Sequence, residues 1–159
     1  VRENIFNILN HSNLINVNIE NSNILDLYSG IGSFGIECLS RGAGNVTFVE
    51  QDTNTILTLK ENISTLSITN KTAIYNSTIE NFLMKNLKKK FDIFFLDPPY
   101  ANNDFLYNLE SIKVKNLFNK NHLIIIHREE NSTDNFEKIL KIIDVKQYRR
   151  SKIIFSKFK

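Results

Sequence analysis

The stretch Ile24-Leu-Asp-Leu-Tyr-Ser-Gly-Ile-Gly-Ser-Phe-Gly35 runs from an apolar strand through three glycines into a segment of helical spacing. Gly30 and Gly32 permit a tight turn and a close backbone approach to a ligand, while Gly35 lets the helix pack against the strand. Glu50 lies 20 residues after Gly30, at the end of the next apolar run, where an acidic side chain can accept hydrogen bonds from ribose hydroxyls. The segment therefore predicts a site for a nucleotide-type ligand.

Short apolar runs alternate with longer segments of helical period along the chain, which is typical of a parallel sheet with helices on both faces. The expected strands are Ile24 to Tyr28, Val46 to Glu50, Thr72 to Tyr75, Phe91 to Leu96, His122 to His127, Ile142 to Gln147 and Lys152 to Ser156. The expected helices are Phe34 to Arg41, Asn54 to Leu66, Ile79 to Leu87, Asp104 to Phe118 and Asn135 to Lys141. The last two strands are too close for a helical crossover, so they predict an antiparallel hairpin at the sheet edge. We expect an α/β fold with a Rossmann-like, seven-stranded, mostly parallel sheet.

Two classes of cofactor fit the glycine loop, because its spacing also matches the dinucleotide fingerprint of nicotinamide enzymes. Asp26 places a carboxylate inside the first strand, four residues before the first glycine. This carboxylate would repel a pyrophosphate, whereas it tolerates the cationic aminoacyl end of S-adenosylmethionine. A buried acid that only caps the glycine turn is the alternative for Asp26, and that role is compatible with either cofactor. The loop favours S-adenosylmethionine but leaves a dinucleotide open.

A second motif, Asp97-Pro98-Pro99-Tyr100, directly follows the apolar run Phe91 to Leu96. An enzyme that methylates an exocyclic base amine must counter the delocalisation of the nitrogen lone pair into the ring, and acceptors for the amine hydrogens do this. The Asp97 carboxylate and a backbone carbonyl of the proline pair can accept these two bonds, and Tyr100 can stack on a base taken out of its helix. The structural alternative is a strand-ending turn with an incidental aromatic residue.

Length and composition exclude several classes of protein. With 159 residues and 42% hydrophobic content, the chain has the size of one domain over residues 1–159. The longest aliphatic run, Leu123 to Ile126, is far below the roughly 20 residues of a membrane helix, so we expect a soluble, cytoplasmic protein without a membrane partner. Cys38 is the single cysteine and the three histidines lack metal-ligand spacing, so we expect no metal site.

The net charge of +3 is too small to indicate a partner, but its distribution is uneven. Between residues 138 and 159, eight basic side chains, Arg149 and Arg150 among them, accompany one acidic side chain, Asp144. That end of the chain can face the phosphates of a nucleic acid. The alternative is a solvated lysine-rich surface, since Asn, Ile and Lys are frequent throughout the chain.

With these two motifs, the sequence resembles the RsmD family of bacterial 16S ribosomal RNA guanine-N2 methyltransferases over nearly its whole length. Val1 to Leu9 resembles the first helix of the family, Ile24 to Ala43 its cofactor loop and following helix, and Phe48 to Glu50 its ribose-binding strand end. Asn76 and Ser77 occupy the place of its adenine-side loop. The resemblance implies catalytic roles for Asp97, Pro98, Pro99 and Tyr100, and cofactor contacts from Asp26, Tyr28, Gly30, Gly32, Gly35, Glu50, Asn76 and Ser77.

The resemblance also implies a reaction. We expect a monomer that transfers a methyl group from S-adenosylmethionine to the exocyclic N2 amine of a guanine in 16S ribosomal RNA, free or within a small-subunit particle. Two departures from the family are visible. The chain opens directly on the first helix, so we expect that a basic, RNA-engaging N-terminal segment is missing. Near the other end, Gln147 to Lys152 replaces a Tyr-Gly-type turn.

Three alternative functions remain open. Methyltransferases of the same fold that act on adenine N6 or on a protein glutamine also use a tetrad ending in Pro-Pro-Tyr. Asp instead of Asn at position 97 weighs against the glutamine enzymes, and 159 residues leave little room for a DNA target-recognition region. A noncatalytic RNA-binding module is the third alternative, against which the intact acids and glycines of both motifs weigh.

Overall fold

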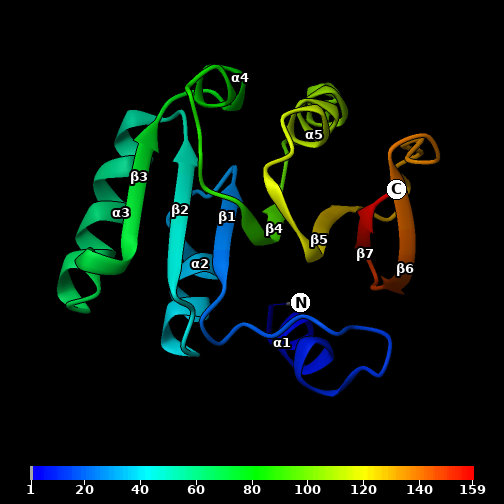
Figure 1. Ribbon diagram of the computed structural model, residues 1–159, viewed down its shortest axis with the longest axis horizontal. Coiled ribbons are helices and arrows are strands. Elements are labelled where there is room, and N and C mark those ends of the chain that lie inside the picture. The colour runs from blue at the N-terminus through cyan, green and yellow to red at the C-terminus, as the bar shows by residue number, and fades with distance from the viewer. Residues whose placement is uncertain (1) are drawn as a thin grey trace.

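A seven-stranded sheet forms the centre of the computed structural model, which describes residues 2–159 (Figure 1). Its strands are β1 Asn23–Leu27, β2 Asn45–Glu50, β3 Thr72–Asn76, β4 Phe91–Leu96, β5 Phe118–Glu129, β6 Leu140–Gln147 and β7 Ser151–Phe158. They lie in the order β3-β2-β1-β4-β5-β7-β6. The first five strands in this order are parallel, and β7 runs antiparallel between β5 and β6. The predicted mostly parallel sheet with an antiparallel edge hairpin is confirmed.

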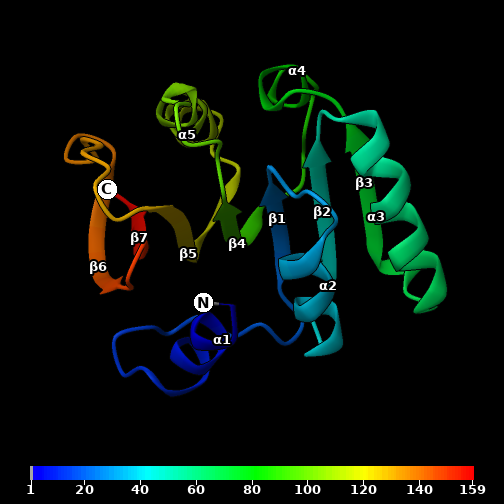
Figure 2. The same ribbon diagram turned by 180° about the vertical axis from the view of Figure 1, so that it is seen from behind.

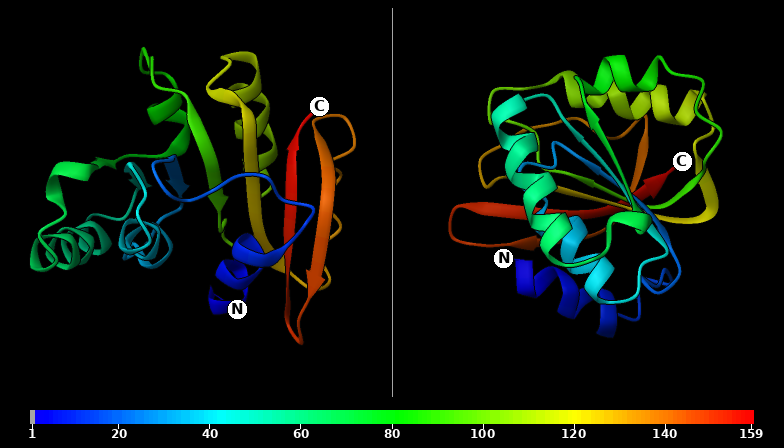
Figure 3. Two further views of the ribbon diagram at one scale, coloured as in Figure 1. Left: turned by 60° about the horizontal axis from the view of Figure 1, so that its bottom comes forward. Right: turned by 90° about the vertical axis from the view of Figure 1, so that its left-hand side faces the viewer.

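Helices cover both faces of this sheet, as predicted (Figure 2). They are α1 Arg2–His11, α2 Ser33–Ser40, α3 Thr53–Thr65, α4 Ile79–Leu83 and α5 Asp104–Val114, with a short 3-10 helix at Thr69–Lys71. Apolar side chains of α1, α2 and α3 share one buried cluster, and those of α4 and α5 share another. The two groups of helices lie on opposite sides of the sheet (Figure 3, right).

The two-residue period of the strands assigns their side chains to these faces. On the side of α1 to α3, Asp26 of β1 lies beside Phe95 of β4, which lies beside Ile125 of β5. Phe34 of α2 stacks on Phe95 with 4.1 Å between ring centroids. Because the strands are parallel, the residues two positions after these lie side by side at the carboxyl edge of the sheet. Open α/β folds bind their ligands at this edge.

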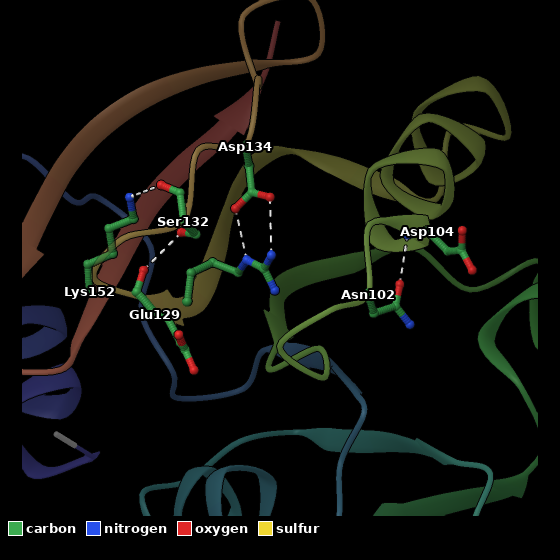
Figure 4. A network of polar contacts seen from close by, with 7 residues as sticks. Asn102, Asp104, Glu129, Ser132, Asp134 and Lys152 are labelled. Carbon is green, nitrogen blue, oxygen red and sulfur yellow. Dashed lines mark hydrogen bonds and ion pairs between the residues drawn. The ribbon is translucent and has the colours of Figure 1, made fainter.

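The helix predicted from Asn135 to Lys141 is wrong. The chain between β5 and β6 is a loop with a single turn, in which the amides of Ile139 and Leu140 both donate to the carbonyl of Phe136. Leu140 already pairs with Phe158 of β7, so too few residues remain for a helix. Side chains hold the loop instead: Asp134 accepts two hydrogen bonds from Arg128 (Figure 4).

Two other helices are shorter than predicted. The helix expected from Ile79 to Leu87 ends at Leu83, and the one expected from Asp104 to Phe118 ends at Val114. After α5, Asn116 takes a left-handed conformation with φ 55°, which ends the helix. Phe118 then pairs with Phe91 of β4, so it belongs to a strand.

Candidate functional site

Three clefts meet at the carboxyl edge of the parallel strands. The Glu50 cleft measures about 720 Å³ and is lined by Tyr28, Val49, Glu50, Gln51, Ser77, Thr78, Ile79, Glu80, Asp97, Pro98, Pro99, Asn102 and Asp104. The glycine-loop cleft measures about 550 Å³ and is lined by Glu3, Asn4, Ile5, Asp26, Tyr28, Ser29, Gly30, Ser33, Phe34, Phe95, Asp97 and His127. The Arg150 cleft measures about 290 Å³ and is lined by Asp97, Pro98, Tyr100, His127, Arg128, Glu129, Arg150 and Ser151. Asp97 borders all three.

The carboxylate of Glu50 is fixed by two backbone amides. Its Oε1 accepts from the amide of Gly30 at 2.9 Å, and its Oε2 accepts from the amide of Asp52 at 2.9 Å. These bonds connect the end of β2 to the glycine turn after β1. Carboxylate oxygens have further lone pairs, so Glu50 can still accept hydrogen bonds from a ligand in its cleft.

The three glycines of the loop have different structural roles. Gly30, with φ 56°, lines the glycine-loop cleft, and a Cβ there would meet nothing within 4 Å. Gly32, with φ 88°, and Gly35 line none of the three clefts. A Cβ on Gly35 would lie 2.4 Å from the ring of Phe48, which agrees with its predicted packing role, and one on Gly32 would lie 2.3 Å from Leu59. Of these three glycines, Gly30 is therefore the one whose backbone a ligand in a cleft could approach closely.

Asp26 is a buried acid at the floor of the glycine-loop cleft, with 1% of its surface exposed. Burial raises the pKa of its carboxyl well above the usual value; the hydrogen bond from Gly35 opposes this shift, and the negative charges of Asp97 and Glu50 add to it. The Gly35 amide donates to Asp26 Oδ2 at 3.2 Å, so the capping role considered for Asp26 is present. A cation in this cleft would favour the charged form of Asp26.

Tyr28 and Ser29 lie where the Glu50 cleft and the glycine-loop cleft approach each other. Tyr28 lines both clefts, has a left-handed φ of 58°, and burial raises its pKa to about 12. The hydroxyl of Ser29 is buried, and it has no hydrogen-bond partner among the side chains of residues 3–159 or the described backbone. Buried polar groups are normally satisfied, so this hydroxyl fits a site that receives a polar ligand.

Asn76 and Ser77 were predicted together but lie differently. Ser77 lines the Glu50 cleft, whereas Asn76 does not line it. The amide of Asn76 instead donates to the carbonyls of Glu50 at 3.4 Å and Gln51 at 3.3 Å, and its Oδ1 accepts from Thr53 at 3.2 Å. Asn76 therefore supports the end of β2 from outside the cleft.

The tetrad after β4 forms a turn that is bonded to the start of α5. The carbonyl of Pro99 accepts from the amide of Asn102 at 2.9 Å. The side chain of Asn102 in turn accepts from the amide of Asp104 at 2.7 Å (Figure 4). Asp97 and Tyr100 stay accessible, with 52% of the Asp97 side chain and 67% of Tyr100 exposed. This turn presents a carboxylate and an aromatic ring to the clefts.

The hairpin between β6 and β7 separates the two arginines that the sequence grouped together. Its turn is closed by the amide of Tyr148, which donates to the carbonyl of Ser151 at 2.8 Å. Arg150 lines the Arg150 cleft with Tyr100, whereas Arg149 does not. The predicted basic end of the chain therefore reaches the tetrad through Arg150.

His127 is a site residue that the sequence reasoning missed. Its Nδ1 lies 3.1 Å from Oδ1 of Asp97, and it borders both the glycine-loop cleft and the Arg150 cleft. The sequence did contain a signal for it, because His127 directly follows the buried run Leu123 to Ile126. Neighbouring parallel strands that end at the same level place their last residues next to each other.

Within residues 2–159, no group of three or more His, Cys, Asp or Glu side chains is arranged to hold a metal ion. Over the same residues, no helix combines the length and the apolar composition needed to cross a bilayer.

The chain is similar to known proteins in sequence. The family described as Conserved hypothetical protein 95 matches residues 1–157. The chain is 38% identical over 112 residues to Ribosomal RNA small subunit methyltransferase D of Buchnera aphidicola subsp. Acyrthosiphon pisum; the match covers 70% of this chain and 58% of the relative. It is 30% identical to an uncharacterized methylase of Rickettsia prowazekii, over 99% of this chain and 86% of the relative. The chain thus spans little more than half the length of the Buchnera protein.

Solved structures give similar folds. A conserved hypothetical protein of Streptococcus pyogenes matches with TM-score 0.86 and 26% identity, covering 100% of this chain and 96% of the other. A putative methyltransferase of Escherichia coli matches with TM-score 0.84 and 24% identity, covering 99% and 83%. A putative methyltransferase complexed with SAH matches with TM-score 0.73 and 17% identity, covering 90% and 47%.

Proposed function

This chain belongs to the family described as Conserved hypothetical protein 95, the RsmD family, and on that premise we propose that it transfers a methyl group from S-adenosylmethionine to the exocyclic N2 amine of a guanine in 16S ribosomal RNA. Its Rossmann-like sheet is the class I fold of S-adenosylmethionine-dependent methyltransferases, as predicted. The substrate is the RNA alone or within a small-subunit particle, and the acting species is a monomer in the cytoplasm.

The position of Asp97 carries this proposal. A group that receives a target amine must lie between the cofactor and the nucleic acid. Asp97 borders the Glu50 cleft and the glycine-loop cleft on one side and the Arg150 cleft on the other. The first two clefts contain the acidic side chains of Glu50 and Asp26, which suit a cationic cofactor. The third contains Glu129 and Arg150, and Arg128 there is paired with Asp134, so Arg150 is the cation left to meet a phosphate.

The residues around the first two clefts fit S-adenosylmethionine. Glu50 would accept hydrogen bonds from the ribose hydroxyls, and Ser77 lies in the same cleft for the adenine side. Asp26, the open backbone of Gly30 and the unpartnered hydroxyl of Ser29 would hold the aminoacyl end. When bound, S-adenosylmethionine supplies a methyl group on a positively charged sulfur. The fit rests on Glu50, which would repel a pyrophosphate, and on Asp26, whose charged form a cation favours.

The tetrad offers two acceptors for the hydrogens of an amine. One is the carboxylate of Asp97. The other is a backbone carbonyl of the proline pair: that of Pro98 accepts no hydrogen bond from the described residues, and that of Pro99, which accepts from Asn102, keeps a second lone pair. With both N–H bonds engaged, the nitrogen lone pair is less delocalised into the ring and is directed at the methyl donor. Tyr100, two-thirds exposed, is free to stack on the base.

Nucleoside analysis of small-subunit ribosomal RNA tests the proposal. RNA from cells with and without this gene would be digested, and the methylated nucleosides measured by mass spectrometry. We expect the deletion to remove one N2-methylguanosine, and the purified protein to restore it with tritium from labelled S-adenosylmethionine. Loss of N6-methyladenosine instead would support the adenine alternative. Identical nucleosides in the two strains, with no tritium transferred, would contradict a methyltransferase function and support the noncatalytic module.

A further inference from the structure

The contact between His127 and Asp97 follows from the sheet register. β4 and β5 are parallel neighbours, and Leu96 pairs with Ile126 at the end of their ladder. Asp97 and His127 each come one residue later, on the face that also carries Phe95 and Ile125. The backbone therefore places these two side chains next to each other at the carboxyl edge, whatever ligand is bound there.

The hydrogen-bonding groups of the pair define which nitrogen donates. Oδ1 of Asp97 lies 3.1 Å from Nδ1 of His127. A carboxylate can only accept, so the proton of the imidazole must be on Nδ1. Among the side chains of residues 3–159, that of His127 is the one that forms a hydrogen bond with the Asp97 carboxylate.

The other nitrogen of the ring is also enclosed. Nε2 of His127 is buried and has no hydrogen-bond partner among the described side chains. A buried donor and a buried acceptor both cost free energy when they are unpaired, so Nε2 alone does not select a tautomer. The assignment of a proton to Nδ1 therefore rests on its contact with the Asp97 carboxylate.

We propose that His127 is a positioning residue for Asp97, an inference that rests on the proposed methyl transfer for its functional part. By donating from Nδ1 to Oδ1, His127 holds the half-exposed carboxylate in one rotamer and leaves Oδ2 to accept from the target amine. Without this bond, the Asp97 side chain would be free to populate other rotamers. Small displacements of a reacting group reduce rates strongly, so the loss should appear in turnover.

The tautomer can be measured without any activity. Long-range proton–nitrogen NMR of the purified protein, with the His127 signal assigned by its loss in His127→Leu, reports which ring nitrogen carries the proton. We expect the proton on Nδ1 in the wild type and a shift of population towards Nε2 in Asp97→Ala. A proton on Nε2 in the wild type, or a ring unaffected by Asp97→Ala, would overturn the proposed hydrogen bond. This result stands even if the proposed function fails.

The functional part needs kinetics with small ribosomal subunits, and with RNA extracted from them, taken from a strain lacking the gene. We expect His127→Leu to lower kcat by about tenfold or more with KM nearly unchanged, and His127→Asn, whose amide donates from a similar position, to recover most of it. The matched control, His11→Leu at the exposed end of α1, should behave as wild type.

A double variant separates positioning from a merely structural role. If His127 acts through Asp97, adding His127→Leu to Asp97→Ala should cause no further loss of kcat. Multiplied losses, or a His127→Asn variant as slow as His127→Leu, would overturn the inference. A wild type that methylates neither probe would instead count against the proposed function, while the NMR result would still decide the His127 contact.

Discussion

The amide of Gly30 donates to Oε1 of Glu50 across 2.9 Å, so the carboxylate that ends β2 also closes the glycine turn after β1. The same side chain lines the largest of the three clefts. A ligand that binds Glu50 therefore also affects the conformation of the glycine turn. This turn places Gly30 at the wall of the neighbouring cleft. Substitution of Glu50 should affect both clefts at once.

We expect Glu50→Ala to weaken S-adenosylmethionine binding by about 1.5 to 3 kcal/mol, the range for hydrogen bonds to a charged group. Glu50→Gln keeps one acceptor for Gly30 and should lose less. Isothermal calorimetry measures both. Glu61→Ala, an exposed acid on α3, is the control for a change of charge alone. Equal affinities for wild type and Glu50→Ala would remove Glu50 from the cofactor site.

The acids of the site also predict which cofactor is rejected. We expect calorimetry to give micromolar affinity for S-adenosylmethionine or its demethylated product, and no binding of NAD at millimolar concentration. The reason is that the Glu50 carboxylate would face and repel the pyrophosphate of NAD, whereas Asp26, whose pKa is raised by burial, takes its charged form most readily beside a cation. Asp26→Asn should weaken binding of the cationic cofactor. Tight NAD binding without affinity for S-adenosylmethionine would restore the dinucleotide alternative.

Asp26 should make stability depend on pH. Its pKa is raised in the folded state, so the folded chain holds a proton that the unfolded chain loses near the ordinary value of 3.8. Wild-type stability should therefore fall, relative to Asp26→Asn, as pH rises from about 4 through the raised pKa. Urea unfolding of both proteins between pH 4 and 8 measures this.

Asp52 provides a control of opposite sign. Hydrogen bonds from the hydroxyl and amide of Thr55 lower its pKa. Its stabilising contribution is present above the unfolded pKa and is lost as pH falls through the folded pKa, so Asp52→Asn should differ from wild type less only below about pH 4, and urea unfolding of this pair is extended to about pH 2. If Asp26→Asn showed this same dependence, burial would not dominate the titration of Asp26.

Most of the chemistry-bearing residues could be predicted because they lie in short, contiguous motifs. Asp26, Gly30, Glu50 and Asp97 all lie around the clefts, since each is close to the carboxyl end of a buried parallel strand. His127 was not found, because its partner lies 30 positions away and only the register of β4 and β5 joins them. Local patterns predict strand ends but not which side chains meet there.

The same limit explains the errors in the fold. The segment from Asn135 to Lys141 has helical spacing, yet Leu140 and Lys141 pair with Phe158 and Lys157 of β7. Pairing with a strand that comes later in the sequence outweighs the local helical propensity of this segment. The order β5-β7-β6 could not be read from the sequence either, because only the closeness of the last two strands was visible there.

The two hairpin arginines should contribute unequally to RNA binding. Arg150 lines the cleft that holds Tyr100, so Arg150→Ala should reduce the slope of log affinity against log salt by about 0.7 to 0.9, the value of one phosphate contact, and Arg149→Ala by less. Filter binding to small-subunit RNA across a salt series measures the slopes. Lys88→Ala, in the loop before β4 at the opposite edge of the sheet, is the charge-matched control. Unchanged slopes for both arginine variants would support a solvated surface.

Asp97 should matter for turnover and not for cofactor affinity. Asp97→Ala removes an acceptor that is positioned for the target amine, so we expect methyl transfer to fall by about a hundredfold or more. Asp97→Asn should be milder, because an amide oxygen still accepts one hydrogen bond. A tritiated-methyl transfer assay gives the rates, and calorimetry should show that both variants still bind S-adenosylmethionine.

The matched control for Asp97 is Asp144→Ala, which removes an acid from β6, at the far edge of the sheet from Glu50. It should transfer methyl groups at the wild-type rate. Two patterns would argue against the proposed role. Equal rates for wild type and Asp97→Ala would remove the tetrad from the mechanism, because among the described residues no other carboxylate borders all three clefts. A slow Asp97→Ala variant that had also lost cofactor binding would place Asp97 in the cofactor site, since substrate methylation then fails for want of a bound donor.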